Sequence, residues 1–286
     1  MASTPTILIT GANGQLGKEF QAISSSFTSF QCIFLSKEEL SIHDKQQVND
    51  FFKKHQPAYL INCAAYTAVD KAETEKESAY HINSEAVGAL ASICKEYNTR
   101  FIHISTDYVF DGKATTPYTE DSPTHPQSVY GASKLEGEML AMKLNPSSIV
   151  IRTSWVYSTF GKNFVKTMLR LMSEKPSINV VNDQAGSPTY AADLAEAIKD
   201  IIVSGNWQPG IYHYSNSGII SWFEFATAIK ELSHSSCIVN PIPSSQYPTP
   251  AMRPGYSALN TNKINHTFRI PIKEWKSSLA VCLSKL

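Results

Sequence analysis

The segment VYGASKLEGE places Tyr130 and Lys134 four residues apart. In a helix, residues at this spacing lie on one face. An ammonium group beside a phenol favours the phenolate and lowers a phenol pKa of about 10. Such a phenol could pass a proton to a carbonyl oxygen while hydride reaches the carbonyl carbon. Because a Tyr-x-x-x-Lys spacing is common by chance, this hypothesis needs support from the rest of the chain.

A second hydroxyl group supports the acid–base hypothesis. The apolar stretch RFIHIST (100–106) is typical of a strand and ends at Thr106. Ligands of open parallel sheets bind outside the carboxyl ends of the strands. The Thr106 hydroxyl could therefore hydrogen-bond either the substrate oxygen or the Tyr130 phenol. We interpret Tyr130, Lys134 and Thr106 as one catalytic group.

A glycine-rich loop lies near the N-terminus. TILITGANGQLGKEF places Gly11, Gly14 and Gly17 directly after the first predicted strand and into the next helix. Glycines allow a tight turn and a close approach to a pyrophosphate, and the helix N-terminus offers free N–H groups. The spacing is G-x-x-G-x-x-G and differs from G-x-G-x-x-G. Its strand–loop–helix context predicts a dinucleotide site.

The end of the second strand bears on the choice of cofactor. NAD-binding folds of this type usually carry an acid there, to bind the ribose hydroxyls. The sequence FLSKEEL instead has Ser36 and Lys37 at this place. A hydroxyl and an ammonium suit a 2′-phosphate, so we predict NADPH as the cofactor and keep NADH open. Glu38 or Glu39 could still reach the ribose.

Strands and helices alternate through the first half of the chain. We predict strands at 6–10, 32–35, 58–65, 100–106 and 148–154, and helices at 14–24, 45–55, 84–98 and 129–143. The strands are apolar on both faces, as a covered parallel sheet requires. This alternation predicts an α/β fold with a Rossmann-like doubly wound parallel sheet.

The alternation of strands and helices becomes less regular after residue 154. Helices are predicted near 160–173, 190–203, 221–232 and 272–285, with a strand-like GIYHYS and a Pro-rich loop over 241–255. We predict a dinucleotide-binding Rossmann-like domain over 1–154. Residues 155–286 should form mostly a smaller C-terminal substrate-binding lobe, with some segments returning to the Rossmann sheet.

Composition excludes several classes of protein. The 286-residue chain has a formal charge of zero, which gives no electrostatic case for a nucleic acid or an anionic membrane as partner. MASTPTILIT has no basic run and no long apolar core, so we expect no signal peptide.

Five scattered cysteines without C-x-x-C spacing indicate reduced thiols and a cytoplasmic location. The eight histidines show no helix-borne zinc spacing, no metal is predicted, and His103 is interpreted as a core residue.

With these motifs in order, the chain resembles the extended short-chain dehydrogenase/reductase family over nearly all its length. It is most similar to the branch that reduces a keto sugar carried on dTDP. The resemblance rests on GANGQLG, NCAAYTAVDKAE, HISTDYVFDG, YGASKLEGE, IRTSWVY, GKNFVKTML, NDQAGSPT and YPTPAMRPGYSALNT. It implies NAD(P)H-dependent reduction of the 4-keto group of dTDP-4-dehydro-L-rhamnose to dTDP-L-rhamnose, the last step of dTDP-rhamnose biosynthesis.

The resemblance also implies roles for individual residues. Tyr130 would donate the proton, Thr106 would assist it, and Lys134 would also bind the nicotinamide ribose. The cofactor would contact Gly11, Gly14, Gln15, Leu16, Gly17, Ser36, Lys37, Ala64, Ala65, Tyr66, Thr67, Tyr130 and Lys134. The sugar nucleotide would contact Thr106, Asp107, Trp155, Val69 and Arg253.

Purely structural roles remain open for several of these residues. Trp155 could be a core aromatic, Asp107 could stabilise a turn, and Arg253 could form a structural ion pair. Asn163 and Lys166 could be a helix start and a surface residue.

Alternatives and departures from the family pattern also remain. The fold could serve as a regulatory subunit of the methionine adenosyltransferase type, or as another sugar-nucleotide epimerase or dehydratase. Some members of the branch form a metal-bridged dimer through glutamates. Glu19 matches one such position, but Ala192 or Asp193 stands where another glutamate is expected. A homodimer is therefore left open and no bridging metal is predicted.

Overall fold

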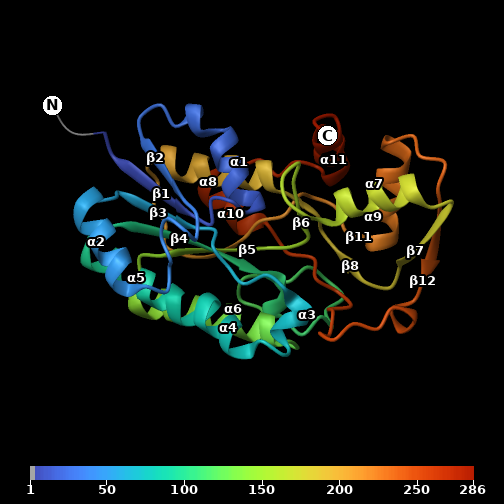
Figure 1. Ribbon diagram of the computed structural model, residues 1–286, viewed down its shortest axis with the longest axis horizontal. Helices are drawn as coiled ribbons and strands as arrows, with labels where there is room; N and C mark the ends of the chain where they lie inside the picture. The colour runs from blue at the N-terminus through green and yellow to red at the C-terminus, as the bar shows by residue number, and fades with distance from the viewer. Residues whose placement is uncertain (1–3) are drawn as a thin grey trace.

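The computed structural model describes residues 4–286, so the first three residues of the segment judged not to be a signal peptide lie outside it. A six-stranded sheet in the order β2-β1-β3-β4-β5-β10 forms its centre (Figure 1). Every neighbouring pair is parallel. The strands are β1 (Thr6–Thr10), β2 (Gln31–Leu35), β3 (Tyr59–Asn62), β4 (Arg100–Thr106), β5 (Ile149–Thr153) and β10 (Gly210–His213). The predicted Rossmann-like α/β fold is confirmed.

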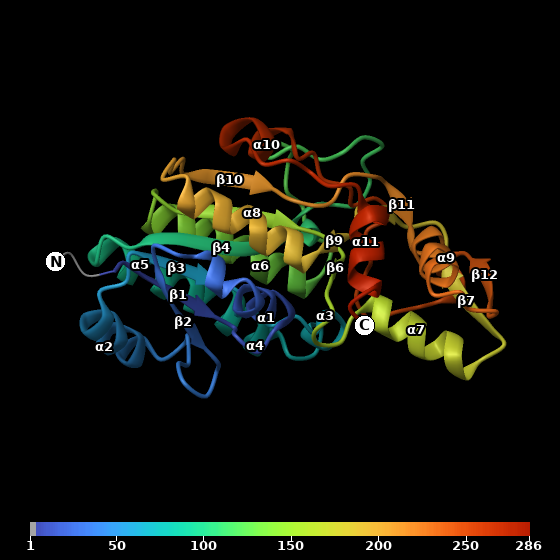
Figure 2. The same ribbon diagram turned by 90° about the horizontal axis from the view of Figure 1, so that it is seen from above.

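Helices cover both faces of the sheet, which explains why the strands are apolar throughout. On one face lie α1 (Gln15–Ala22), α8 (Ala191–Val203) and α10 (Asn262–Phe268), which share a buried cluster with the sheet (Figure 2). The other face is covered by α2 (Lys45–His55), α5 (Ala86–Glu96) and α6 (Val129–Leu144). Because helices exclude solvent from both faces of the sheet, β1 and β5 are buried along their whole length.

A third apolar cluster, called the smaller apolar cluster below, belongs to elements that lie beyond one end of the sheet (Figure 1). It is built from α7 (Phe164–Glu174), α9 (Trp222–Leu232) and α11 (Trp275–Leu283), together with the parallel pair β7 (Ser177–Val181) and β12 (Ile238–Ile242). Short pairs connect it to the sheet: β6 (Val156–Tyr157) with β9 (Thr189–Tyr190), and β8 (Ala185–Gly186) with β11 (Ile220–Ser221). A capping box between Ser221 and Glu224 starts α9.

The chain departs from the expected elements at a few places. The strand expected over 58–65 ends at Asn62, and the helix expected from residue 84 has an earlier start. It begins as α4 (Lys76–Tyr80) and runs through a π-helical turn, η2 (His81–Glu85), into α5. Further short elements were not predicted: α3 (Val69–Ala72), α10, and the 3₁₀ turns η1 (Ser24–Ser26), η3 (Asp107–Val109) and η4 (Ser244–Gln246). These pieces are too short to show a periodic pattern.

No helix within residues 4–286 combines the length and the apolar character needed to cross a membrane.

Candidate active site

A cleft of about 750 Å³ opens where β1, β3, β4 and β5 end. Gly11, Cys63, Thr106 and Thr153 line it and lie at or just beyond the last residues of these strands. Because all four strands are parallel, their carboxyl ends meet at one edge of the sheet. Open parallel sheets bind their ligands at this edge.

The glycine loop forms one wall of the cleft. Gly11 has a left-handed φ of +67°, and a Cβ there would lie 2.6 Å from the backbone nitrogen of Ala64. A Cβ on Gly17 would lie 2.4 Å from the Gly11 carbonyl oxygen. Neither position can accept a side chain unless the backbone moves. The loop therefore lies close against the backbone just after β3 and leads directly into α1.

The start of α1 can hold an anion. Gly14 is its N-cap and no side chain caps the helix. The first-turn N–H groups consequently remain available, next to the positive end of the helix dipole. Gly14, Gln15 and Leu16 all line the cleft, as predicted for a pyrophosphate site. The glycine loop, which has no side chains at its glycines, and the uncapped N-terminus of α1 fit a dinucleotide cofactor.

The end of β2 places only part of the predicted 2′-phosphate site in the cleft. Lys37 is exposed and lines the cleft together with Glu38. Ser36 is buried and does not line it. The Ser36 N–H donates to Glu39 Oε2 at 2.8 Å, which turns this carboxylate away from a ribose-binding role.

The segment after β3 contributes a second wall. Ala64, Ala65, Thr67 and Val69 line the cleft. Tyr66 does not line it, because its backbone is paired with the Asn83 side chain and its hydroxyl donates to Glu75 at 2.6 Å. These contacts hold the segment at a fixed distance from the π-helical turn.

Tyr130 and Lys134 both line the cleft from the first two turns of α6, which Ser128 caps. Their side chains have different environments. The Lys134 ammonium is buried and donates to the Ile104 carbonyl oxygen at 2.6 Å, with His103 Nε2 at 3.3 Å. Tyr130 is half-buried and packs edge-on against Tyr108, with ring centroids 5.4 Å apart.

The expected lowering of the Tyr130 pKa is wrong for this structure. Desolvation raises the pKa of Tyr130 to about 12, against a smaller lowering by the Thr106 hydroxyl. Desolvation also lowers the pKa of Lys134 to about 8. The physical reason is that burial removes water from the charged form of each group, and the nearby Asp107 charge adds to the rise for Tyr130. The Tyr130 phenol therefore stays protonated at neutral pH and can act as an acid.

Thr106 and Asp107 end β4 inside the cleft. The Thr106 hydroxyl donates to Asp107 Oδ1 at 3.0 Å and accepts the Tyr108 N–H at 3.3 Å. Asp107 is buried, and desolvation raises its pKa to about 6, against lowering by hydrogen bonds. The predicted turn-stabilising role and the cleft position of Asp107 are thus compatible.

Trp155 lines the cleft from the segment between β5 and β6. It has a left-handed φ of +48°, which is rare for a bulky side chain and costs energy. Its indole stacks on Trp222 of α9, with ring centroids 3.5 Å apart and planes inclined by 9°. Trp155 is therefore a wall of the cleft and also a packing contact of the smaller apolar cluster.

Arg253 lies outside the cleft. Its Nη2 donates to Asp70 Oδ2 at 2.7 Å, and the residue lines a small hollow near Tyr108. The ion pair is present, and the buried Nη1 is left without a hydrogen-bond partner among the described residues.

The structure adds residues that sequence reasoning missed. Tyr108, Lys162, Ser41 and His43 also line the cleft. Tyr108 follows the predicted STD motif directly, so its place could have been inferred. Lys162 lies in a loop before α7, and no periodic pattern marks it.

Asn163 connects the two sides of the cleft. Its Oδ1 caps α7 by accepting the Lys166 N–H at 3.1 Å, and its Nδ2 donates to Gln15 Oε1 at 2.9 Å. Lys166 donates to the Thr159 carbonyl oxygen at 3.1 Å. Asn163 is thus a helix cap that also reaches the glycine loop.

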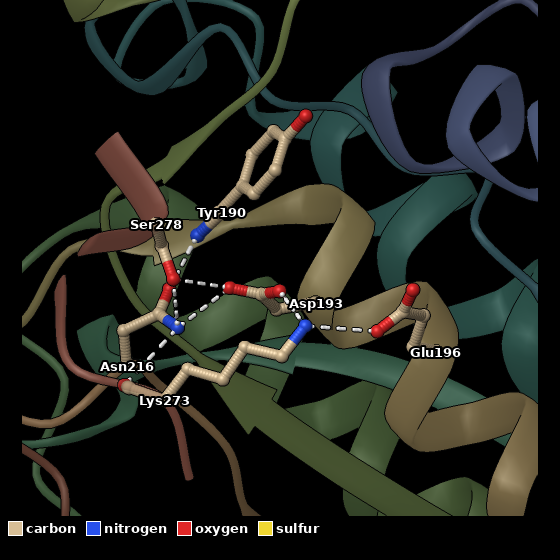
Figure 3. Close-up of polar contacts among 6 residues, drawn as sticks. All are labelled: Tyr190, Asp193, Glu196, Asn216, Lys273 and Ser278. Atoms are coloured by element: carbon tan, nitrogen blue, oxygen red, sulfur yellow. Dashed lines mark hydrogen bonds and ion pairs between the residues drawn. The ribbon is translucent and has the colours of Figure 1, made fainter. Parts of the chain in front are cut away.

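The two acids considered for a metal bridge have protein partners. Glu19 is buried and accepts the Ser158 hydroxyl at 2.6 Å. Asp193 is buried and accepts hydrogen bonds from Asn216, Lys273 and Ser278 (Figure 3). No group of three or more His, Cys, Asp or Glu side chains suited to a metal ion occurs within residues 4–286.

Comparisons with known proteins agree with this geometry. The chain matches the family described as RmlD substrate binding domain over residues 5–286. It is 41% identical over 283 residues to dTDP-4-dehydrorhamnose reductase of Aggregatibacter actinomycetemcomitans, with 96% of each chain covered. It is 42% identical over 273 residues to the spore coat polysaccharide biosynthesis protein SpsK of Bacillus subtilis, with 96% of this chain and 95% of that protein covered.

A solved structure shares the whole fold. The dTDP-4-dehydrorhamnose reductase of Bacillus anthracis, in complex with NADP, superposes with a TM-score of 0.95 at 37% identity. The match covers 99% of this chain and 100% of that chain.

Proposed function

The chain belongs to the RmlD substrate binding domain family, and from this premise we propose that it is an NADPH-dependent oxidoreductase. It reduces the 4-keto group of dTDP-4-dehydro-L-rhamnose and yields dTDP-L-rhamnose. The observation that carries this proposal is a single cleft shared by a glycine loop, an uncapped helix N-terminus and the Tyr130 phenol. Its relatives bear the same activity in their names.

The glycine loop and the start of α1 would bind the cofactor diphosphate. Lys37 is the exposed cation at the end of β2 and would bind the 2′-phosphate. Ala64, Ala65 and Thr67 would lie along the cofactor. NADPH, when bound, supplies the hydride. Because Ser36 is buried and Tyr66 points to Glu75, their contribution would come through the backbone.

Tyr130 would supply the proton. As C4 of the sugar gains hydride, its oxygen gains negative charge and takes the phenol proton of Tyr130. The pKa of about 12 keeps this proton in place until the oxygen becomes basic. Solvent then replaces the proton on Tyr130. Thr106 would donate to the same oxygen once its hydroxyl turns from Asp107 Oδ1, and the charged form of Lys134 would stabilise the transient phenolate.

The sugar nucleotide would lie between the sheet edge and the smaller apolar cluster. Trp155 and Val69 would pack against the sugar, and Asp107 would accept hydrogen bonds from the hydroxyl groups of the sugar. Arg253 would have to turn its buried, unpaired Nη1 toward the cleft to contact the diphosphate, a contact for which a guanidinium is suited.

The remaining assignments stay proposals. Residues 1–154 would form the dinucleotide-binding domain and 155–286 mostly the substrate-binding lobe, with α8, β10 and α10 returning to the sheet. A homodimer and a cytoplasmic location also stay predictions.

The proposal is tested by a turnover assay across a panel of keto sugar nucleotides, with NADPH and NADH followed in parallel. We expect oxidation of the cofactor only with the 4-keto sugar and a higher kcat/KM with NADPH. Cofactor oxidation in the absence of a keto sugar would contradict the activity. So would the absence of cofactor oxidation with every keto sugar nucleotide of the panel. A clear NADH preference would overturn the role of Lys37.

A further inference from the structure

His103 is a fully buried histidine that contacts the active site from inside the sheet. It lies in β4, three residues before Thr106. Its Nε2 is 3.3 Å from Lys134 Nζ, and its Nδ1 is 3.1 Å from Asn62 Nδ2. Both ring nitrogens therefore have polar partners. Its influence on Lys134 depends on which nitrogen carries the proton.

The orientation of the Asn62 amide decides this question. Asn62 ends β3, and its Oδ1 accepts the backbone N–H of Ala64 at 3.2 Å. A backbone N–H can only donate, so the amide atom facing it must be the oxygen. The Thr10 hydroxyl donates to the same oxygen at 2.7 Å. The Asn62 amino group consequently faces His103.

The Asn62 amino group can only donate, so His103 Nδ1 must accept. Burial and the nearby Lys134 charge lower the pKa of His103 well below its usual value, so the ring is neutral. A neutral imidazole has one N–H, and here it must be on Nε2. This N–H points at Lys134 Nζ.

An N–H directed at an amine nitrogen is accepted only by the uncharged amine. The same N–H disfavours the ammonium form of the lysine. The ammonium has no lone pair to accept it, and its positive charge repels the partly positive hydrogen of the N–H. The clear acceptor for Lys134 is the Ile104 carbonyl oxygen at 2.6 Å. His103 and Ile104 together thus hold Lys134 Nζ at one place beside β4.

Other titratable groups face Lys134 or pair with its neighbours. They are Cys63 after β3, Tyr130 and Glu138 on α6, and Arg152 on β5. Burial raises the pKa of Cys63, so the thiol stays uncharged. Glu138 favours the Lys134 ammonium, but its carboxylate pairs with Arg152 at 2.7 Å, and Arg152 balances the charge of Glu138.

We propose that His103 is a positioning residue for Lys134: its Nε2–H, fixed by Asn62, orients the lysine and weakens the affinity of the lysine for its proton. The consequence for catalysis deepens the proposed reductase function and rests on it. A lysine that exchanges its proton near neutral pH can follow the changes of charge on Tyr130 during turnover. The geometry itself belongs to the ligand-free protein and does not depend on the reaction.

The tautomer is tested directly in the wild-type protein. Long-range proton–nitrogen NMR correlations distinguish protonated from unprotonated ring nitrogens of histidine. The His103 signal, assigned by its loss in His103→Gln, should show Nε2 protonated and Nδ1 unprotonated at neutral pH. A protonated Nδ1, or a charged ring, would overturn the proposal whatever the activity assay gives.

The effect on Lys134 is tested by carbon NMR of ε-labelled lysines across pH, without cofactor or substrate. Lys134, assigned by its loss in Lys134→Met, should titrate far below the other lysines. In Asn62→Asp the carboxylate accepts from Nδ1–H, which moves the proton and turns Nε2 into an acceptor. The Lys134 midpoint should then rise by at least about one pH unit, a tenfold change in proton affinity. The alkaline limb of kcat/KM should shift with it.

Cys63→Ala is the matched control for the Lys134 titration. It removes an uncharged neighbour of Lys134 and keeps the chain from Asn62 to His103. Its Lys134 midpoint should stay within about 0.3 pH units of wild type, small against the one-unit shift above. A Lys134 that titrates with the surface lysines, or an unchanged midpoint in folded Asn62→Asp, would contradict the proposal. If Asn62→Asp does not fold, the wild-type tautomer decides.

Discussion

The indole of Trp155 lies flat on that of Trp222, with ring centroids 3.5 Å apart. Trp155 lines the cleft at the sheet edge, and Trp222 begins α9 of the smaller apolar cluster. Phe164 supports Trp222 from α7 at 4.6 Å. Because Trp155 has a strained φ of +48°, it needs such support to keep its place.

Trp222→Ala should therefore loosen Trp155 and weaken substrate binding. We expect KM for the sugar nucleotide to rise about tenfold, a loss of roughly 1.4 kcal/mol, with cofactor affinity nearly unchanged. Steady-state kinetics and a separate cofactor titration measure both quantities. Trp207→Ala is the control, since Trp207 packs on Tyr59 far from the cleft. Equal KM effects in the two variants would contradict this role.

Gly11→Ala should reduce cofactor binding. The new Cβ would lie 2.6 Å from the Ala64 nitrogen, so the Cys63–Ala64 backbone must move away from the glycine loop. We expect the cofactor dissociation constant to rise at least tenfold, or about 1.4 kcal/mol. Fluorescence titration with NADPH measures this.

Gly205→Ala provides a matched control for this strain. Gly205 has a similar φ of +68°, but a Cβ there meets nothing within 4 Å. It should lose about 1 kcal/mol of stability and keep its cofactor affinity. A normal cofactor affinity in Gly11→Ala would show that the close approach is not required.

Asp193→Ala should destabilise the fold. Asp193 is buried and joins Asn216, Lys273 and Ser278 from three separate segments (Figure 3). Its removal leaves buried donors poorly satisfied, at a cost of about 2–3 kcal/mol in the free energy of unfolding. Glu196→Ala removes the more exposed carboxylate that also pairs with Lys273, and should cost less than about 0.5 kcal/mol. Denaturant unfolding of both variants would separate the two; similar losses would refute the account.

The rate should depend on pH through Lys134. Desolvation lowers the pKa of Lys134 to about 8, so its stabilising charge is present below this pH and is lost above it. We therefore expect kcat/KM for reduction to fall as pH rises through about 8. Tyr130, with a pKa of about 12, keeps its proton through this range and does not cause the fall. In Lys134→Arg, whose guanidinium stays charged, the alkaline limb should disappear at a lower overall rate.

Much of the fold could be predicted because its signals are local. Five apolar strands, the helices between them and the glycine loop follow from short-range patterns. The same patterns place Thr106, Tyr130 and Lys134 at one edge of the sheet. The π-helical turn at His81–Glu85 could not be predicted, since it depends on contacts such as that of Asn83 with the Tyr66 backbone.

The electrostatics of the site could not be predicted from spacing. A Tyr–Lys pair suggests a lowered phenol pKa, but desolvation dominates and raises it. Desolvation depends on how the sheet, α6 and the segment after β3 pack together. The pairing of Arg253 with Asp70 spans 183 residues and also has no local signal.

Tyr130→Phe should abolish turnover while cofactor binding survives, because only the proton is lost. We expect a fall in kcat of about 10²–10⁴-fold, typical of a missing general acid. A variant with a near-normal rate would show that another group donates the proton.

The most direct test of the whole account uses NADPH deuterated at the hydride position and dTDP-4-dehydro-L-rhamnose. We expect one cofactor to be oxidised per sugar and the deuterium to lie on C4 of the dTDP-L-rhamnose formed. Deuterium retained on the cofactor, or a product whose C4 carries only hydrogen, would contradict it.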